Sequence, residues 1–169
     1  MTVKREDNKW TRKMARRPDT AKIRCYLFQC RDLPAADDTG SSDPVVVVYT
    51  TVDSDSNKDR MTRQVCETKV IENNCDPMFY ELLELRIDYY KGEDLPPFIF
   101  DVYDIDKAYI GSDDRDYLGR CVINVKDAAY KIISEAEDNE NMKPLVPKWH
   151  PIRYSQGSPK SGEILVSFV

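Results

Sequence analysis

Four consecutive valines, Val45 to Val48, constrain the fold of this chain more than any other feature. Their β-branched side chains fit a buried pleated strand better than a helix, because a helix restricts rotation about χ1. They belong to a predicted strand over residues 44–52. Similar short apolar or alternating segments recur between clusters of turn residues. The other predicted strands cover residues 22–30, 63–71, 79–88, 97–104, 117–124, 148–154 and 162–169.

This succession of short strands predicts an all-β fold, an eight-stranded antiparallel β-sandwich. Residues 126–137 differ, since apolar side chains recur there at helical spacing, and they predict a short helix inserted in a loop. A chain of 169 residues is long enough for one well-buried core and short for two domains. We therefore expect a single domain over residues 21–169, after a leader over residues 1–20.

Charge is unevenly distributed along the chain. The leader holds seven Lys and Arg against three Asp and Glu, although the whole chain has a formal net charge of −5. We expect a basic, flexible leader on an acidic body, and an acidic body argues against nucleic acid as a partner. The five cysteines show no CxxC spacing, which favours reduced thiols in a cytosolic protein.

Aspartates gather beside the ends of predicted strands that lie far apart in the sequence. They are Asp37 and Asp43 before the strand at 44, Asp104 and Asp106 around the end of the strand at 97, and Asp113, Asp114 and Asp116 before the next strand. Hard divalent cations need several oxygen ligands at once, and carboxylates so close together repel one another without a cation. The pattern predicts a calcium site if the fold brings these segments together. By contrast, we expect Asp101 to face solvent on its strand.

Several motifs in a fixed order resemble a C2 domain over about residues 21–169. They are Arg31-Asp32-Leu33-Pro34, Ser42-Asp43-Pro44, Asp76-Pro77, Val102-Tyr103-Asp104-Ile105-Asp106 and Asp116-Tyr117-Leu118-Gly119-Arg120. The closing segments, Lys148 to Ile152 and Ser161 to Phe168, look more like a C2 domain of the ferlins, large vesicle-fusion and membrane-repair proteins. The absence of a strand candidate before 22–30, with an extra one at the C-terminus, resembles the circularly permuted, type II form.

The resemblance implies calcium-dependent binding to anionic phospholipid membranes, as a module of a larger ferlin-like protein that works in the cytoplasm, peripheral to the cytosolic face of a membrane. It implies Ca²⁺ ligands at Asp37, Asp43, Asp104, Asp106 and Asp116, with Asp113 as the alternative last ligand because the third loop is long. Loop-tip residues that would enter the bilayer are Tyr109, Ile110 and Ala36.

The alternative is a calcium-independent domain for protein or phosphoinositide interaction, with a vestigial calcium site. Arg60, Arg63 and Lys69 would then form a basic face for inositol lipid or an acidic partner, such as another domain of the parent protein. An enzyme is not predicted, because the chain has one histidine and contains no Gly-x-Ser-x-Gly motif and no Gly-rich phosphate loop.

Overall fold

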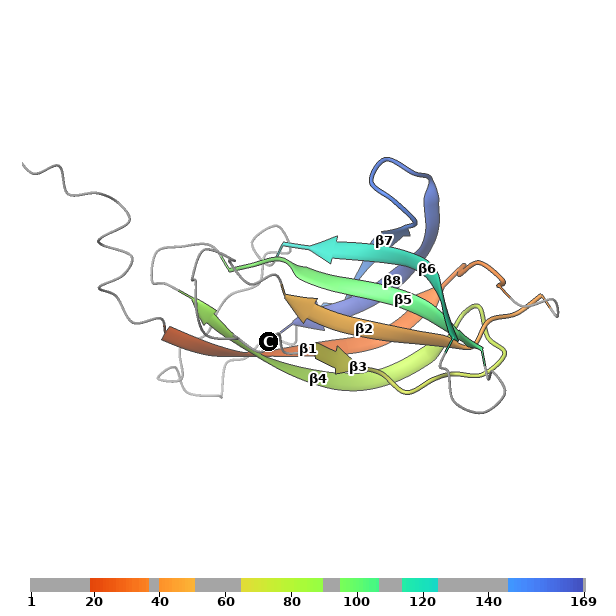
Figure 1. Cartoon of the computed structure of the whole chain (residues 1–169). Helices are drawn as coiled ribbons and strands as arrows, with labels where there is room; N and C mark the ends of the chain where they lie inside the picture. The colour runs from red at the N-terminus through yellow and green to blue at the C-terminus, as the bar shows by residue number, and fades with distance from the viewer. Residues whose placement is uncertain are drawn as a thin grey trace, which may run out of the picture.

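The computed structural model describes residues 19–36, 40–50, 65–89, 95–106, 114–124 and 146–168. Its strands are β1 (Asp19–Arg31), β2 (Pro44–Thr50), β3 (Val65–Glu67), β4 (Met78–Tyr89), β5 (Phe98–Asp106), β6 (Asp114–Ile123), β7 (Lys148–Arg153) and β8 (Lys160–Phe168), shown in Figure 1. The predicted eight-stranded antiparallel β-sandwich is confirmed. The predicted helix near 126–137 lies outside the described residues, as does the leader up to residue 18.

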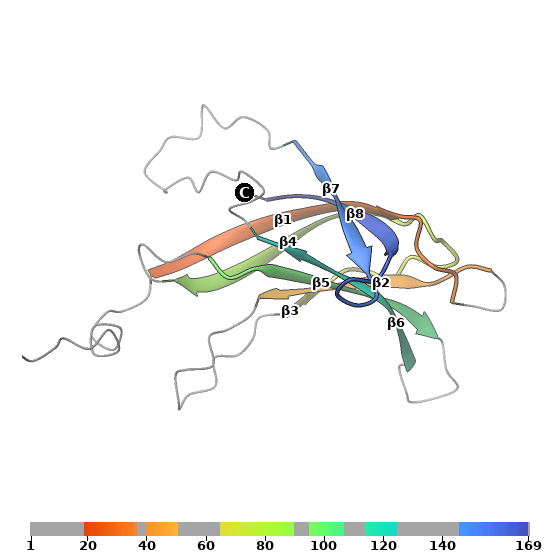
Figure 2. The ribbon, with the colours of Figure 1, turned by 90° about the horizontal axis from the view of Figure 1, so that it is seen from above.

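The strands are hydrogen-bonded in the order β3-β2-β5-β6-β7-β8-β1-β4. Only one residue pair, Arg120 with Arg153, joins β6 to β7 in the described register. The sheet therefore folds at this point into two layers, β3-β2-β5-β6 and β7-β8-β1-β4, which Figure 2 shows from above. The C-terminal strand β8 pairs with β1 from Cys25 to Arg31. No helix among the described residues is long and apolar enough to cross a membrane.

The core lies between the two layers and is built from alternate residues of their strands. Phe168 of β8 meets Phe98 and Phe100 of β5, with ring centroids 4.9 and 6.1 Å away. Three of the five cysteines, Cys25, Cys30 and Cys121, are buried and act as small core residues, and all five are free thiols. Burial raises the pKa of Cys121 to about 12, so this thiol stays protonated.

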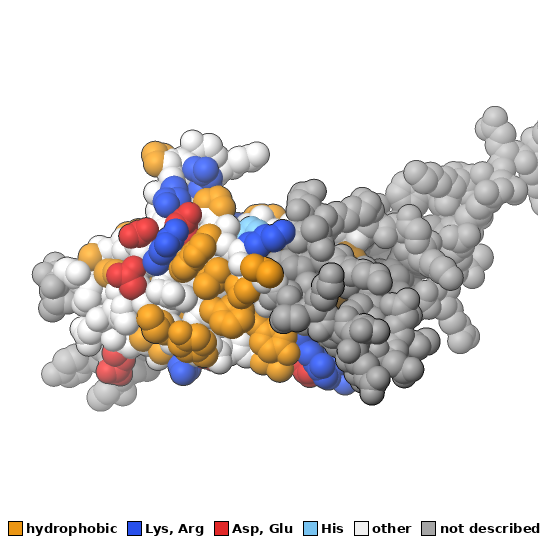
Figure 3. Space-filling model, turned by 180° about the vertical axis from the view of Figure 1, so that it is seen from behind, with side chains coloured by type: hydrophobic (Ala, Val, Ile, Leu, Met, Phe, Trp, Pro, Cys, Tyr) orange, Lys and Arg blue, Asp and Glu red, His pale blue; other side chains and the backbone are white. Residues whose placement is uncertain are grey.

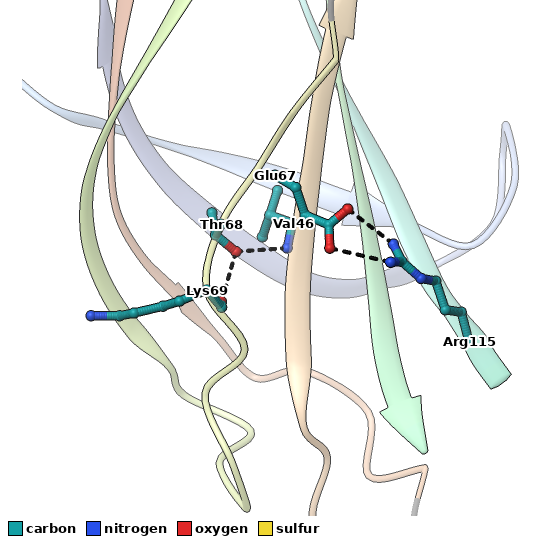
Figure 4. A network of polar contacts seen from close by, with 5 residues as sticks. All are labelled: Val46, Glu67, Thr68, Lys69 and Arg115. Atoms are coloured by element: carbon teal, nitrogen blue, oxygen red, sulfur yellow. Dashed lines mark hydrogen bonds and ion pairs between the residues drawn. The ribbon is translucent and has the colours of Figure 1, made fainter. Parts of the chain in front are cut away.

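The third strand ends earlier than predicted, since β3 ends at Glu67 and the predicted strand runs to residue 71. Figure 4 shows the reason: the side-chain Oγ1 of Thr68 accepts the Val46 amide at 3.0 Å and donates to the carbonyl of Lys69 at 3.0 Å. The Thr68 side chain thus accepts the Val46 amide of β2, which in a regular ladder would donate to a backbone carbonyl. The regular ladder therefore ends at Glu67, which accepts two hydrogen bonds from Arg115 at 3.1 and 3.2 Å.

The expectation that Asp101 faces solvent is wrong, because its residue is only 2% exposed. Arg120, its register partner on β6, donates to both carboxylate oxygens at 2.6 and 2.9 Å. The hydroxyl of Tyr49 donates to the same carboxylate at 2.7 Å and accepts from Arg120 at 2.9 Å. The hydrogen bonds to Asp101 raise the pKa of Arg120. Asp101 can be buried because a cation and a phenol satisfy its charge.

Candidate metal centre

Strands β5 and β6 both extend further than predicted, so Asp104, Asp106 and Asp116 lie on strands beside the loop that joins them. In the register, Asp104 lies opposite Asp116 and Asp106 lies opposite Asp114. Residues two apart on a strand share a face, so Asp104, Asp106 and Asp116 follow one side of the β5-β6 pair. Like charges directly opposite each other destabilise a sheet by a few tenths of a kcal/mol to about 1 kcal/mol. A bound cation would remove that cost.

Asp43 is held against Asp104 at the start of β2. Its amide donates a short hydrogen bond to Oδ1 of Asp104, and its carbonyl accepts the amide of Ile105 at 3.1 Å. The following residue, Pro44, is the register partner of Asp104. Asp104 is only 1% exposed, whereas Asp106 and Asp116 are exposed. Three strands therefore place these carboxylates at the same end of the sandwich.

A residue that the sequence analysis missed, Asn73, also reaches this site. Its amide donates to Oδ1 of Asp43 at 2.7 Å, and its side-chain oxygen accepts from the hydroxyl of Ser41 at 3.3 Å. The φ angle of Asn73 is 54°, in the left-handed region that Asn tolerates better than most residues. The Asn73-Asn74 pair ahead of the Asp76-Pro77 turn was the signal in the sequence for such a bend.

The loop before β2 is anchored by Ser42, whose side chain is buried. Its hydroxyl donates to the carbonyl of Pro34 at 2.8 Å and accepts the amide of Ala36 at 3.0 Å. Its own carbonyl accepts the amide of Asn74 at 2.8 Å. Figure 1 shows the segments around these residues at the right-hand end, with the end of β5 and the start of β6. Ala36 is exposed there, on the loop predicted to contact a membrane.

The donor chemistry fits a hard divalent cation. Asp43, Asp104, Asp106 and Asp116 offer only oxygen ligands, which suit Ca²⁺ or Mg²⁺ better than metals that prefer nitrogen or sulfur. No group of three or more His, Cys, Asp or Glu side chains among the described residues is arranged to hold a metal ion. Asp37 and Asp113, the other predicted ligands, lie outside the described residues. The described carboxylates therefore do not make a metal site by themselves.

The remaining predicted contact residues are only partly described. Tyr109 and Ile110 lie outside the described residues, as do Arg60 and Arg63 of the predicted basic face. Lys69 of that face is exposed, and its amide donates to Glu81 at 2.9 Å. In Figure 4 its side chain points away from the ion pair of Glu67 and Arg115. The structure therefore describes one of the three residues of the basic face.

Comparison with known proteins adds a family match and several similar structures. The family model of the C2 domain matches residues 21–149. A C2 domain of plant Extended Synaptotagmin 1 is 19% identical, with a TM-score of 0.59, and the match covers 90% of this chain and 95% of that one. Calcium-bound Extended-Synaptotagmin 2, solved as a pair of C2 domains, is 19% identical at a TM-score of 0.58, over 90% of this chain and 46% of that one.

A more distant match concerns a larger protein. Human GIVD cytosolic phospholipase A2, in complex with an inhibitor and terbium chloride, is 16% identical at a TM-score of 0.56. The match covers 90% of this chain and 17% of the phospholipase. At these identities the similar structures support the β-sandwich fold.

Proposed function

We propose that this chain, which belongs to the C2 domain family, binds anionic phospholipid membranes in a calcium-dependent manner and does not catalyse a reaction. The observation that carries the proposal is the carboxylate arrangement at one end of the sandwich, where Asp104 lies opposite Asp116 and accepts the amide of Asp43. One of the similar structures, Extended-Synaptotagmin 2, is calcium bound, which supports the same chemistry here.

The residues that would hold calcium are Asp37, Asp43, Asp104, Asp106 and Asp116, with Asp113 in place of Asp116 as the alternative last ligand in the long third loop. When bound, Ca²⁺ would neutralise these carboxylates and bridge them to lipid phosphate or carboxylate groups. In its absence the carboxylates repel an anionic surface. The hydrogen bonds from Asn73 to Asp43 and from Asp43 to Asp104 hold two of the carboxylates in place beforehand, which limits the ordering that binding requires.

Apolar residues on the loops at this end would make the second part of the contact. Ala36 is exposed beside the carboxylates, and Tyr109 and Ile110 lie in the sequence between Asp106 and Asp113. Once the charge is neutralised, such side chains can enter the headgroup region, and each then gains the free energy of apolar burial.

The parent protein that we propose is ferlin-like, a larger protein of vesicle fusion or membrane repair that works at the cytosolic face of a membrane. One feature supports this finer assignment: the closing segments, Lys148 to Ile152 and Ser161 to Phe168, resemble ferlin C2 domains in sequence.

Sedimentation with liposomes tests the docking mechanism. The protein should sediment with phosphatidylserine vesicles in calcium, remain in solution in chelator, and bind neutral phosphatidylcholine vesicles weakly. Ile110→Asp should weaken partition about tenfold or more, because burial of an isoleucine side chain is worth roughly 1.5–3 kcal/mol. Calcium affinity in solution, measured by calorimetry, should not change, since Ile110 offers no ligand.

The matched control is Val122→Asp, which adds the same charge at an apolar residue that is 54% exposed on β6, away from the loop end. Its partition should stay close to that of the unchanged protein. Equal binding to neutral and anionic vesicles, or binding that persists in chelator, would reject the calcium-dependent mechanism. If Ile110→Asp partitions normally, the loop tip does not take part in the contact, and electrostatic bridging alone holds the domain at the membrane.

A further inference from the structure

The outer face of the β7-β8-β1-β4 layer carries an apolar band, formed by Tyr26 and Phe28 on β1 and by Met78, Tyr80 and Leu82 on β4. Tyr80 is 71% exposed, Met78 53% and Leu82 47%. Tyr26 lies opposite Leu82 in the register, so the band continues across both strands. Figure 3 shows hydrophobic side chains gathered in the middle of this face, with charged groups at its ends. Such residue types are enriched where proteins bind other proteins.

An irregularity in the pairing of β1 with β4 shapes the apolar band. The register of β1 with β4 passes from Leu27 and Glu81 to Gln29 and Met78, so two residues of β4 lie opposite Phe28 alone. This is a β-bulge, a feature that redirects side chains. The rings of Phe28 and Tyr80 meet edge to face, with their centroids 6.4 Å apart. The bulge therefore sets two aromatic rings side by side on the exposed face.

Tyr80 adopts this position at a cost in backbone conformation. Its φ angle is 51°, in the left-handed region, which costs a residue other than glycine about 1–2 kcal/mol. Its side chain is mostly exposed, so packing within the domain offsets little of that cost. Non-glycine residues held in such conformations gather at functional sites.

The end of the apolar band near the N-terminus of β1 is positively charged. Glu84 contacts the ammonium of Lys22 at 2.7 Å and the guanidinium of Arg24 at 3.0 Å. These hydrogen bonds lower the pKa of Glu84, which is therefore ionised. Two cations around one carboxylate leave a net positive charge at this end.

The opposite end repeats the arrangement with other residues. Glu163 contacts Arg31 at 2.6 Å and Lys160 at 3.3 Å. Arg31 also lies over the ring of Trp149, 4.0 Å from its centroid, which holds the guanidinium against the face. The exposed Asp32 and Asp76 also lie at this end, so it is not net positive, whereas the end at Lys22 and Arg24 is, although the whole chain is net negative. An occupant with apolar and acidic groups would complement this pattern.

We propose that the apolar band binds an acidic amphipathic segment of a partner protein. The apolar face of the segment would cover Tyr80 and Leu82, and its carboxylates would meet Lys22 and Arg24 at the net positive end. The choice of a protein over a bilayer rests on the proposed function: the loops of the candidate metal centre lie at one end of the strands, so a domain docked by those loops directs the apolar band sideways from the membrane.

Peptide binding to the full chain, measured by calorimetry in chelator, tests this proposal without the calcium mechanism. The probe is a synthetic amphipathic helix of about five turns with leucines on one face and glutamates on the other. A second peptide has lysine in place of every glutamate. The glutamate peptide should bind at least about tenfold more tightly than the lysine peptide, and its affinity should fall as salt is raised from about 50 to about 200 mM.

Tyr80→Asn is the informative variant, because asparagine accepts the left-handed conformation and the protein should fold at least as stably. It should weaken glutamate-peptide binding at least about fivefold, while Val122→Asn, a matched change on the other layer, leaves binding unchanged. No saturable binding, equal binding of both peptides, or full binding by Tyr80→Asn would overturn the proposal. The protein could instead sediment with phosphatidylserine vesicles without calcium, or self-associate. If Tyr80→Asn abolishes either behaviour, the apolar band binds lipid or a second copy of the chain, respectively. If the peptide does not bind, the proposal of calcium-dependent membrane docking is unaffected. If docking in calcium fails, peptide binding in chelator can still be measured.

Discussion

Replacing Asp104 and Asp106 together by asparagine should abolish the stabilisation of the domain by calcium and leave the β-sandwich folded. Ions that bind only the native state add RT ln(1 + [L]/Kd), about 2.7 kcal/mol at one hundred times Kd. For a domain of this size that raises the melting temperature by about 5–11 °C. Magnesium should stabilise less, since a flexible set of oxygen ligands suits Ca²⁺ better. The double variant should show no shift with either ion.

The fold should survive this change because Oδ1 of asparagine can still accept the amide of Asp43. Without calcium the variant should be as stable as the unchanged protein or slightly more stable, since replacing Asp104 removes a like charge opposite Asp116 in the register. Thermal unfolding in chelator and in millimolar calcium measures both effects. Global unfolding of the variant in chelator would show that these aspartates are structural.

The matched control changes two other aspartates at the same end of the sandwich. Asp32→Asn with Asp76→Asn removes the same charge, and the hydrogen bond from the Asp32 amide to Oδ1 of Asp76 can persist. Asp32 has a φ angle of 55°, which asparagine also tolerates. This control should keep the calcium shift. If the melting temperature of the protein without substitutions is the same in chelator and in calcium, the metal site is rejected altogether.

The strands could be predicted because their signals are local. The valines from Val45 to Val48 fit a strand wherever it lies in the sheet, and each of the eight predicted strands has a counterpart in the structure. The length of β3 could not be predicted, since it depends on the Thr68 hydroxyl meeting the Val46 amide 22 residues away. A side chain that competes for a ladder donor leaves no periodic signal in its own segment.

The candidate metal centre could be predicted only by residue type. The aspartates that follow predicted strands indicated oxygen ligands, but which backbone amides orient them depends on the fold. Asn73 reaches Asp43 across 30 residues, and nothing in the alternation of apolar residues indicates that contact. The burial of Asp101 was missed for the same reason, because its partners Tyr49 and Arg120 lie 71 residues apart in the sequence. A charged residue such as Asp101 is expected to be exposed unless a partner on another strand is known.

Arg120→Met should destabilise the domain by about 2–3 kcal/mol. The Asp101 side chain is 4% exposed, and the substitution removes two hydrogen bonds and the counter-charge from its carboxylate. Breaking a buried ion pair on one side costs about 3–5 kcal/mol, because the remaining charge is left uncompensated. We expect the smaller loss of about 2–3 kcal/mol here, since the Arg120 side chain is 45% exposed and water can reach the position that it leaves. The melting temperature should fall by about 4–12 °C.

The origin of that loss is tested by adding Asp101→Asn to Arg120→Met. If the penalty comes from an uncompensated carboxylate, removing the charge should restore about half of the lost stability or more, while the Tyr49 hydroxyl can still donate to the asparagine oxygen. Denaturant unfolding of the two single variants and the double variant gives the coupling free energy of the pair. A double variant whose loss equals the sum of the single losses would show that Arg120 acts through the packing of its methylene groups on the sheet, and that the buried carboxylate is satisfied by Tyr49 without it.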